Sequence, residues 1–179
     1  MSRVPQNTPE KATPEIEQIY EEFKKKMGRI PNIFLHMGHS AVALRGYLAQ
    51  QELAGKTSIP PKLREEIALV VAEVNKCHYC LSAHSAIAKM QGLNAQQINF
   101  ARKGESANSK ESAILQFAKK IVEKRGDLSE ADVDTLKKNG VTDQEIVDVI
   151  FLVSINIFTN YFNLVVDPEV DFPEPAKLS

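Results

Sequence analysis

Residues 65–92 read EEIALVVAEVNKCHYCLSAHSAIAKMQG, and this segment decides how the rest of the chain is interpreted. It holds the only two cysteines, Cys77 and Cys80, as a C-x-x-C pair. His84 follows Cys80 by four residues, and Glu65 precedes Cys77 by twelve. Two thiols, an imidazole and a carboxylate are the groups of a thiol redox site, so we interpret the remaining chain as the scaffold that holds them.

The segment predicts two consecutive helices, one ending near Asn75 and one over about residues 77–91. Both sulfurs would then lie at the first turn of the second helix. Free backbone N–H groups and the helix dipole stabilise a thiolate there, and they can lower a thiol pKa from about 8.5 to somewhere in the range ~3.5–7.5. Residues four apart share a helix face, so His84 is within reach of Cys80, directly or through one water.

Glu65 lies on the preceding helix. If the two helices form a hairpin, its carboxylate is expected to fold back towards His84. It would orient the imidazole there and hold its proton, as the third group of a triad does. His78 and Tyr79 lie between the two cysteines and are expected to tune the thiols from outside rather than to act as the base.

The main alternative for the cysteine pair is a zinc site with His84 as the third ligand. Structural zinc sites normally combine two such pairs, or one pair with a distant pair of histidines, and the sequence contains neither pattern. Thiols are kept reduced in the cytosol. A C-x-x-C in a cytosolic protein is therefore expected to be catalytic or metal-binding rather than a structural disulfide.

Helical periodicity and capping residues predict an all-α protein of seven to nine helices with a helix-hairpin active site. We expect one helical domain over residues 13–166, a flexible N-terminal arm over 1–12 and an extended C-terminal tail over 167–179. Within the domain, Glu66 and Glu73 are interpreted as solvent-facing residues, and Asn160 and Asn163 as buried, hydrogen-bonded helix residues. The expected helices cover about residues 14–27, 32–38, 41–53, 61–74, 77–91, 94–102, 109–124, 129–138 and 143–166.

The last of these helices is apolar on almost every side, and such a helix must be buried all round. One small domain can hardly cover it, so we expect a subunit interface and a homo-oligomer, as a dimer, trimer or hexamer. Its longest apolar stretch, near residues 149–158, is interrupted by polar residues and is expected to be too short to cross a bilayer.

Composition narrows the function further. The net charge of −1 gives no electrostatic reason to bind nucleic acid or an anionic membrane. The first residues, MSRVPQNTPEKATPE, contain no apolar leader segment, which predicts a cytoplasmic protein. The sequence has no G-x-G-x-x-G and no other nucleotide motif, so we expect no bound cofactor, and electrons must come from another molecule.

Glu65 followed by NKCHYCLSAH (residues 75–84) resembles the alkylhydroperoxidase AhpD-like group of the carboxymuconolactone decarboxylase superfamily. The family pattern is a Glu twelve residues before a C-x-x-C and a His four residues after its second Cys, and this sequence keeps all four positions. The surrounding text also fits: PNIF near the start, LREEIALVVAEVN, and the closing GVTDQEIVDVI and FTNYFN. The resemblance covers roughly residues 31–166.

The resemblance implies an all-helical fold, symmetric oligomers and peroxide reduction by a cysteine pair. It implies that Cys80 is the peroxidatic thiol, that Cys77 is the resolving thiol, and that Glu65 and His84 form a proton relay. The best-studied members have a histidine where this chain has Tyr79. That departure bears on the efficiency of the reaction rather than on its type.

We therefore predict an antioxidant thiol peroxidase that uses an external dithiol, or a lipoyl-type reductant protein, as its electron donor. A disulfide reductase or redox sensor with the same C-x-x-C is the first alternative. A non-catalytic zinc-binding or interaction protein is the second.

Overall fold

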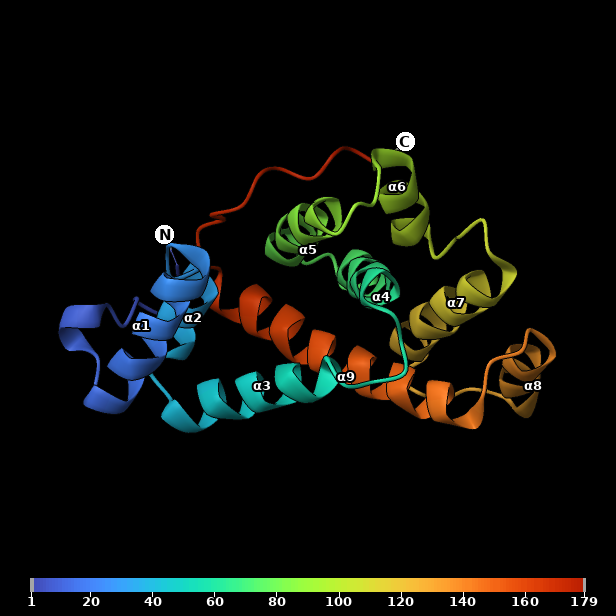
Figure 1. Ribbon diagram of the computed structural model, residues 1–179, viewed down its shortest axis with the longest axis horizontal. Helices are drawn as coiled ribbons and strands as arrows, with labels where there is room; N and C mark the ends of the chain where they lie inside the picture. The colour runs from blue at the N-terminus through green and yellow to red at the C-terminus, as the bar shows by residue number, and fades with distance from the viewer. Residues whose placement is uncertain (1, 179) are drawn as a thin grey trace.

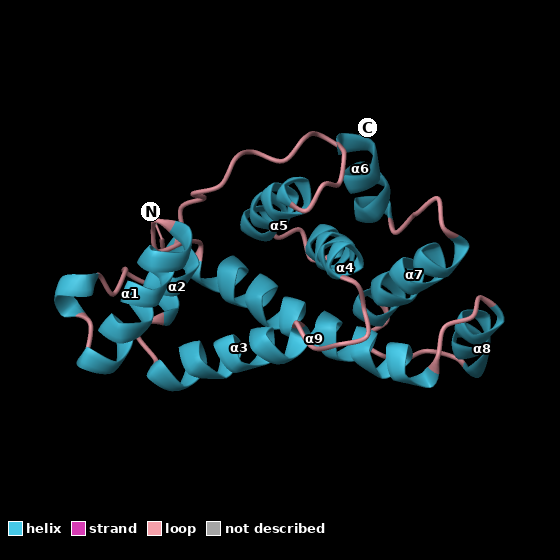
Figure 2. Ribbon diagram, in the orientation of Figure 1, coloured by secondary structure: helices cyan, strands magenta, loops and turns pink. Residues whose placement is uncertain are grey.

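The computed structural model describes residues 2–178, and all regular structure within them is helical (Figure 2). The predicted all-α fold is confirmed, with nine α-helices in the described part of the chain. After a short 3₁₀ turn at Pro9–Lys11, the helices are α1 (Pro14–Met27), α2 (Asn32–Met37), α3 (Ala41–Ala54), α4 (Pro61–Val74), α5 (His78–Met90), α6 (Ala95–Lys103), α7 (Ser109–Glu123), α8 (Glu130–Lys138) and α9 (Asp143–Val166).

Local capping chemistry sets several of these helix ends. Capping boxes begin α6, α8 and α9, with Asn94, Ser129 and Thr142 as the N-cap residues. The α1 helix ends at Gly28, whose φ of 73° lies in the left-handed region that favours glycine. Such signals are local, which is why the sequence placed these boundaries well.

Helix α4 lies at the centre of the molecule and packs against α5, α6, α7 and α9 (Figure 1). Its residues from Ile67 to Ala72 are all buried, so every side of this part of the helix is apolar.

The interpretation of Glu66 and Glu73 as solvent-facing is wrong. Glu66 is 8% exposed, and Glu73 forms a 2.7 Å ion pair with the buried Arg102 of α6, because α6 and α7 cover the face that was expected to be open.

Helix α9 runs beneath α4 as the longest element (Figure 1). By length and composition alone it is long and apolar enough to cross a membrane, which corrects the shorter estimate from the sequence. In the fold it packs against α3, α4, α5 and α7, and half of its most apolar window is buried. Within the single chain one strip of α9 stays exposed: Val147, Ile150, Phe158, Tyr161, Leu164 and Val165.

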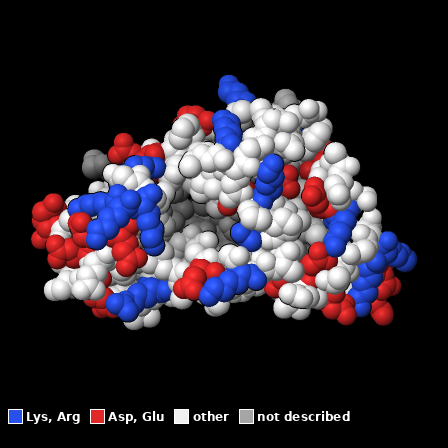
Figure 3. Space-filling model, in the orientation of Figure 1, with Lys and Arg blue, Asp and Glu red and all other residues white. Residues whose placement is uncertain are grey.

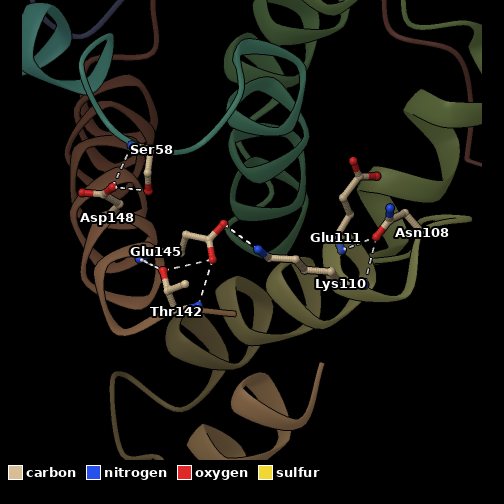
Figure 4. Close-up of polar contacts among 7 residues, drawn as sticks. All are labelled: Ser58, Asn108, Lys110, Glu111, Thr142, Glu145 and Asp148. Carbon is tan, nitrogen blue, oxygen red and sulfur yellow. Dashed lines mark hydrogen bonds and ion pairs between the residues drawn. The ribbon is translucent and has the colours of Figure 1, made fainter. Parts of the chain in front are cut away.

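Polar contacts fix the N-terminal half of α9 against the rest of the domain (Figure 4). Ser58, in the loop before α4, donates to the Asp148 carboxylate from its backbone N–H and its hydroxyl, at 2.8 and 2.6 Å. Lys110, in the first turn of α7, forms a 2.8 Å ion pair with Glu145. These contacts hold the direction of α9, and so the position of its C-terminal half beneath α5.

The two terminal segments both lie against the helical domain. Arg3 donates a hydrogen bond of 2.6 Å to the Leu164 carbonyl, and the Tyr20 hydroxyl donates to the Asn7 carbonyl at 2.8 Å. The C-terminal segment, residues 167–178, contains no helix and crosses from the end of α9 over α5 to α6 (Figure 1). This segment is called the strap below.

Candidate functional site

Cys77 and Cys80 are joined in a disulfide, so the structure represents the oxidised site. Cys77 is the N-cap residue of α5, and its sulfur accepts the backbone N–H of Cys80 at 3.3 Å. Both sulfurs therefore lie at the N-terminal turn of the helix, as the sequence predicted. After reduction, the helix dipole and the free N–H groups of this turn stabilise the thiolate form.

The hairpin of α4 and α5 brings Glu65 and His84 together. The Glu65 carboxylate and the His84 Nδ1 lie 2.8 Å apart, and both side chains are mostly buried. A tight turn at Asn75–Lys76 reverses the chain between the two helices, with Lys76 at a φ of 56°. The predicted contact is thus present, and it leaves the His84 Nε2 as the ring nitrogen available to other partners.

Cys80 and His84 lie on the wall of the same cavity. This cavity has a volume of about 280 Å³ and is mainly apolar. No hydrogen bond joins His84 to Cys80 within the described residues, so the two groups meet through the cavity rather than through a direct bond. Figure 3 shows a recess near the centre of the face, where white, uncharged atoms predominate and a few charged atoms lie at the edge. The apolar wall consists of Phe23, Met27, Pro31, Ile33, Phe34, Tyr47, Leu48, Ala83, Ile87 and Phe172.

Only one of the two cysteines lines this cavity. Cys80 does, whereas Cys77 does not. A molecule bound in the cavity would therefore meet the Cys80 sulfur, with Cys77 behind it and already at disulfide distance. The cavity thus distinguishes the Cys80 sulfur, which it reaches, from the Cys77 sulfur, which it does not.

A second, more polar cavity of about 180 Å³ lies on the other side of the His84–Glu65 pair. Glu65 and His84 both line it, together with Arg64, Gln91 and Asn156. His84 lines both cavities, so its imidazole lies between the apolar cavity that holds the Cys80 sulfur and the polar cavity that Glu65 also lines. A pair in this position can pass protons between the two.

Tyr79 and His78 contact the strap rather than the sulfurs. The Tyr79 hydroxyl donates to Asp171 at 2.7 Å and accepts the Ile33 backbone N–H at 3.2 Å. Burial, followed by the hydrogen bond to Asp171, raises the pKa of Tyr79, so the phenol stays neutral. His78 lies 3.0 Å from Glu174, with both side chains largely exposed. Their predicted role in tuning the thiols stays a prediction.

The strap adds a wall residue that sequence reasoning missed. Phe172 lines the Cys80 cavity, meets the Tyr79 ring edge-on at 5.7 Å, and lies 4.7 Å beneath the Arg29 guanidinium. Asp171 beside it also binds Arg29. No periodic pattern marks these residues in the sequence, because their positions depend on the path of a loop.

Asn163 of α9 was also missed. Its side-chain amide donates to the Cys80 sulfur at 3.3 Å, and it lines the same cavity. The sequence analysis interpreted it only as a buried, hydrogen-bonded helix residue. Its position as a polar side chain within a largely apolar helix was the available signal.

Within residues 2–178, no group of three His, Cys, Asp or Glu side chains is arranged to hold a metal ion.

Comparison with known proteins places this arrangement among related folds. The model of the Carboxymuconolactone decarboxylase family matches residues 40–123, which include all four predicted site residues. No curated protein matches the chain. Among solved structures, the chain is similar to an uncharacterized peroxidase-related protein with an alkylhydroperoxidase AhpD core from Ralstonia eutropha JMP134. The TM-score is 0.85 and the identity 23%, over 95% of this chain and 92% of that one.

Two further solved structures share the fold. A peroxidase-related protein from Silicibacter sp. TM1040 has a TM-score of 0.81 and 24% identity, over 96% of this chain and 97% of that one. An alanine variant of the debrominase Bmp8, in complex with 2,3,4-tribromopyrrole, has a TM-score of 0.80 and 21% identity, over 96% of this chain and 92% of that one. Proteins named as peroxidase-related and as a debrominase thus share the fold of this chain.

Proposed function

We propose that this chain, whose residues 40–123 match the Carboxymuconolactone decarboxylase family and whose fold is shared with AhpD-core structures, is a thiol-dependent peroxidase that reduces organic hydroperoxides. One observation carries the proposal. Cys80 alone of the two cysteines lines an apolar cavity, and it shares that cavity with His84, whose imidazole is held by Glu65. A thiol, its partner thiol and an oriented acid–base group are the parts that peroxide reduction needs.

The proposed reaction begins with the reduced pair. The Cys80 thiolate attacks the terminal oxygen of the hydroperoxide, so an S–O bond forms as the O–O bond breaks. The departing alkoxide takes a proton from His84 and leaves as an alcohol, while Cys80 becomes a sulfenic acid. Cys77 then attacks this sulfur, water leaves, and the Cys77–Cys80 disulfide forms. Two thiols of an external dithiol reduce the disulfide by exchange.

The lining of the cavity favours a hydroperoxide with an apolar organic group. Phe23, Phe34, Tyr47 and Phe172 contribute aromatic surface, and burial of such a group against them contributes about 25 cal/mol per Å². Hydrogen peroxide makes none of these contacts, so it is expected to be the poorer substrate.

The partners follow from the same site. We propose a dithiol or lipoyl-type reductant protein, because the reaction consumes two thiols per turnover. We also propose a cytoplasmic homo-oligomer in which a second copy covers the exposed strip of α9. This strip contains no charged residue and ends near the strap.

A steady-state assay tests the proposed function. Consumption of cumene hydroperoxide, tert-butyl hydroperoxide and hydrogen peroxide is measured with dihydrolipoamide or dithiothreitol as reductant. Cys80→Ser is expected to abolish turnover, whereas reduced Cys77→Ser, freed of reductant, should consume one equivalent of peroxide and stop at the sulfenic acid. A wild-type rate equal to that of Cys80→Ser would refute the proposal. Reduction of protein disulfides without peroxide consumption would support the disulfide reductase alternative instead.

A second candidate is reductive dehalogenation of a small aromatic compound. The aromatic lining of the cavity favours it, and the debrominase of similar fold gives the precedent. In this reaction two thiols and an aryl bromide would give the disulfide, the debrominated ring and hydrogen bromide, so the electrons balance. Bromide release from tribromopyrrole, with no peroxide turnover, would favour this candidate over the first.

A further inference from the structure

Helix α9 contacts the cysteine turn through two asparagines that lie about one helical turn apart. Asn160 is fully buried, and its carbonyl accepts the side-chain amide of Asn75 at 2.9 Å, in the turn just before Cys77. Asn163 is 5% exposed, and its amide donates to the Cys80 sulfur at 3.3 Å. The two residues lie on the same side of the helix but bind different groups. Asn160 binds the side chain of Asn75 in the turn, and Asn163 binds the sulfur of Cys80.

We propose that Asn163 is a catalytic residue of this site. Its amide N–H stabilises the Cys80 thiolate, and its carbonyl holds the sulfenic acid that forms from it. The proposal rests on the proposed function for its second half only, since the thiolate can be examined without any peroxide.

The first half follows from the contact itself. A hydrogen bond donated to the charged form of a group favours that form, so the Asn163 amide lowers the pKa of the Cys80 thiol. It acts together with the N-terminus of α5. The other titratable groups that share the Cys80 cavity are His84 and Tyr79 of α5 and Tyr47 of α3, and Glu65 of α4 lies behind His84. None of these forms a hydrogen bond to the sulfur in the described structure, whereas Asn163 does.

The role of Asn163 towards the sulfenic acid follows from the carbonyl oxygen of its side chain. The Asn163 carbonyl oxygen is buried and has no hydrogen-bond partner within the described residues. Buried polar atoms are normally paired, so this acceptor is unusual. The reaction supplies a donor beside it. When the thiolate attacks a hydroperoxide, the terminal oxygen and its hydrogen move onto sulfur, and the O–H of the resulting sulfenic acid can bond to this carbonyl while the alkoxide takes its proton from His84.

A purely structural role predicts a different pattern of bonds. Asn156, two turns earlier on α9, shows that pattern, because its amide donates to the Leu152 carbonyl of its own helix at 2.8 Å. Within residues 2–178 the Asn163 side chain makes no such bond to its own helix, and its amide donates to sulfur instead. The Asn163 side chain therefore hydrogen-bonds to Cys80 rather than to the backbone of its own helix.

The experiment isolates Cys80 in a Cys77→Ser background of the full chain and measures the iodoacetamide alkylation rate against pH. Asn163→Leu removes both the donor and the acceptor, and the thiolate fraction at pH 7 is expected to fall roughly three- to tenfold. Asn163→Asp keeps the shape of the side chain but places a carboxylate at the sulfur, so the fall should be larger. Asn160→Leu is the matched control. It removes a buried asparagine from the same helix, and its alkylation profile should superimpose on that of the background protein.

Each outcome decides the proposal. Superimposable profiles for Asn163→Asp and the background would overturn it, and so would an equal displacement in Asn160→Leu, because the effect would then be structural. Asn163→Asp preserves volume, so it decides the question even if Asn163→Leu does not fold. Dimedone trapping after one equivalent of cumene hydroperoxide reports the sulfenic acid, which should be trapped or overoxidised faster in Asn163→Leu, because the carboxylate of Asn163→Asp can still accept its O–H. Failure of the proposed function would appear separately, as a lack of peroxide consumption by the wild type.

Discussion

Glu66 is a carboxyl group buried in the centre of the domain, away from the cysteines. It lies on α4, is 8% exposed, and has no hydrogen bond or ion pair within the described residues. Burial, followed by the charge of Glu111 on α7, raises its pKa to about 7, with Lys62 partly offsetting both. Figure 4 shows Glu111 at the first turn of α7. We predict that replacing this carboxyl group stabilises the protein only at higher pH.

The size and sign follow from proton linkage. A carboxyl group with a pKa of 4.5 in the unfolded chain and about 7 in the folded protein keeps its proton longer when folded. The folded state then binds more protons between these values, so the free energy of unfolding falls as pH rises from 4.5 to 7 and stays reduced above that. Each pKa unit corresponds to about 1.4 kcal/mol, so the loss is roughly 3 kcal/mol at pH 8.

The Glu66→Gln variant removes this loss, because the amide does not ionise. Urea unfolding at 25 °C, followed by circular dichroism, gives the free energy of unfolding of both proteins at pH 5 and pH 8. We expect the variant to gain about 2–3 kcal/mol on the wild type between the two pH values. Glu123→Gln, at an exposed position of α7, is the control and should gain nothing. An equal difference between Glu66→Gln and wild type at both pH values would refute the reasoning.

Three further predictions concern the site and the assembly. Removing the His84 imidazole or the Glu65 carboxylate should lower peroxide turnover by at least about tenfold, because positioned proton transfer contributes roughly 10²–10⁴-fold. Steady-state rates of His84→Gln and Glu65→Gln test this prediction, and unchanged rates would exclude the relay. Phe172→Ala should widen the Cys80 cavity and improve kcat/KM for larger hydroperoxides, by roughly fourfold for each extra CH₂ that becomes buried. The values of kcat/KM for alkyl hydroperoxides of increasing length test this prediction. The same dependence of kcat/KM on chain length in variant and wild type would contradict it. Light scattering at micromolar concentration should give a multiple of 19.9 kDa, because exposed apolar residues of α9 favour a covering subunit, whereas the monomer mass would contradict the predicted interface.

The sequence by itself determined the helical class, the helix boundaries and the core of the candidate site. Capping residues, glycines and apolar spacing act over a few positions, so they carry the same meaning in the sequence as in the folded chain. The C-x-x-C at a helix start and the His84 spacing are local in this sense. The Glu65–His84 contact was also accessible, because only a short turn separates the two helices that carry these residues.

Only the tertiary structure decided which distant groups complete the site. Asn163 and Cys80 are 83 positions apart, and Asp171 and Tyr79 are 92 apart. These contacts depend on how α9 crosses beneath α5 and on the path of the strap. The helical periodicity of the sequence carries no information on either. The burial of Glu66 has the same origin. Periodicity gives the direction in which a side chain points from its own helix, but only the packing of α6 and α7 over α4 decides whether water or protein lies in that direction.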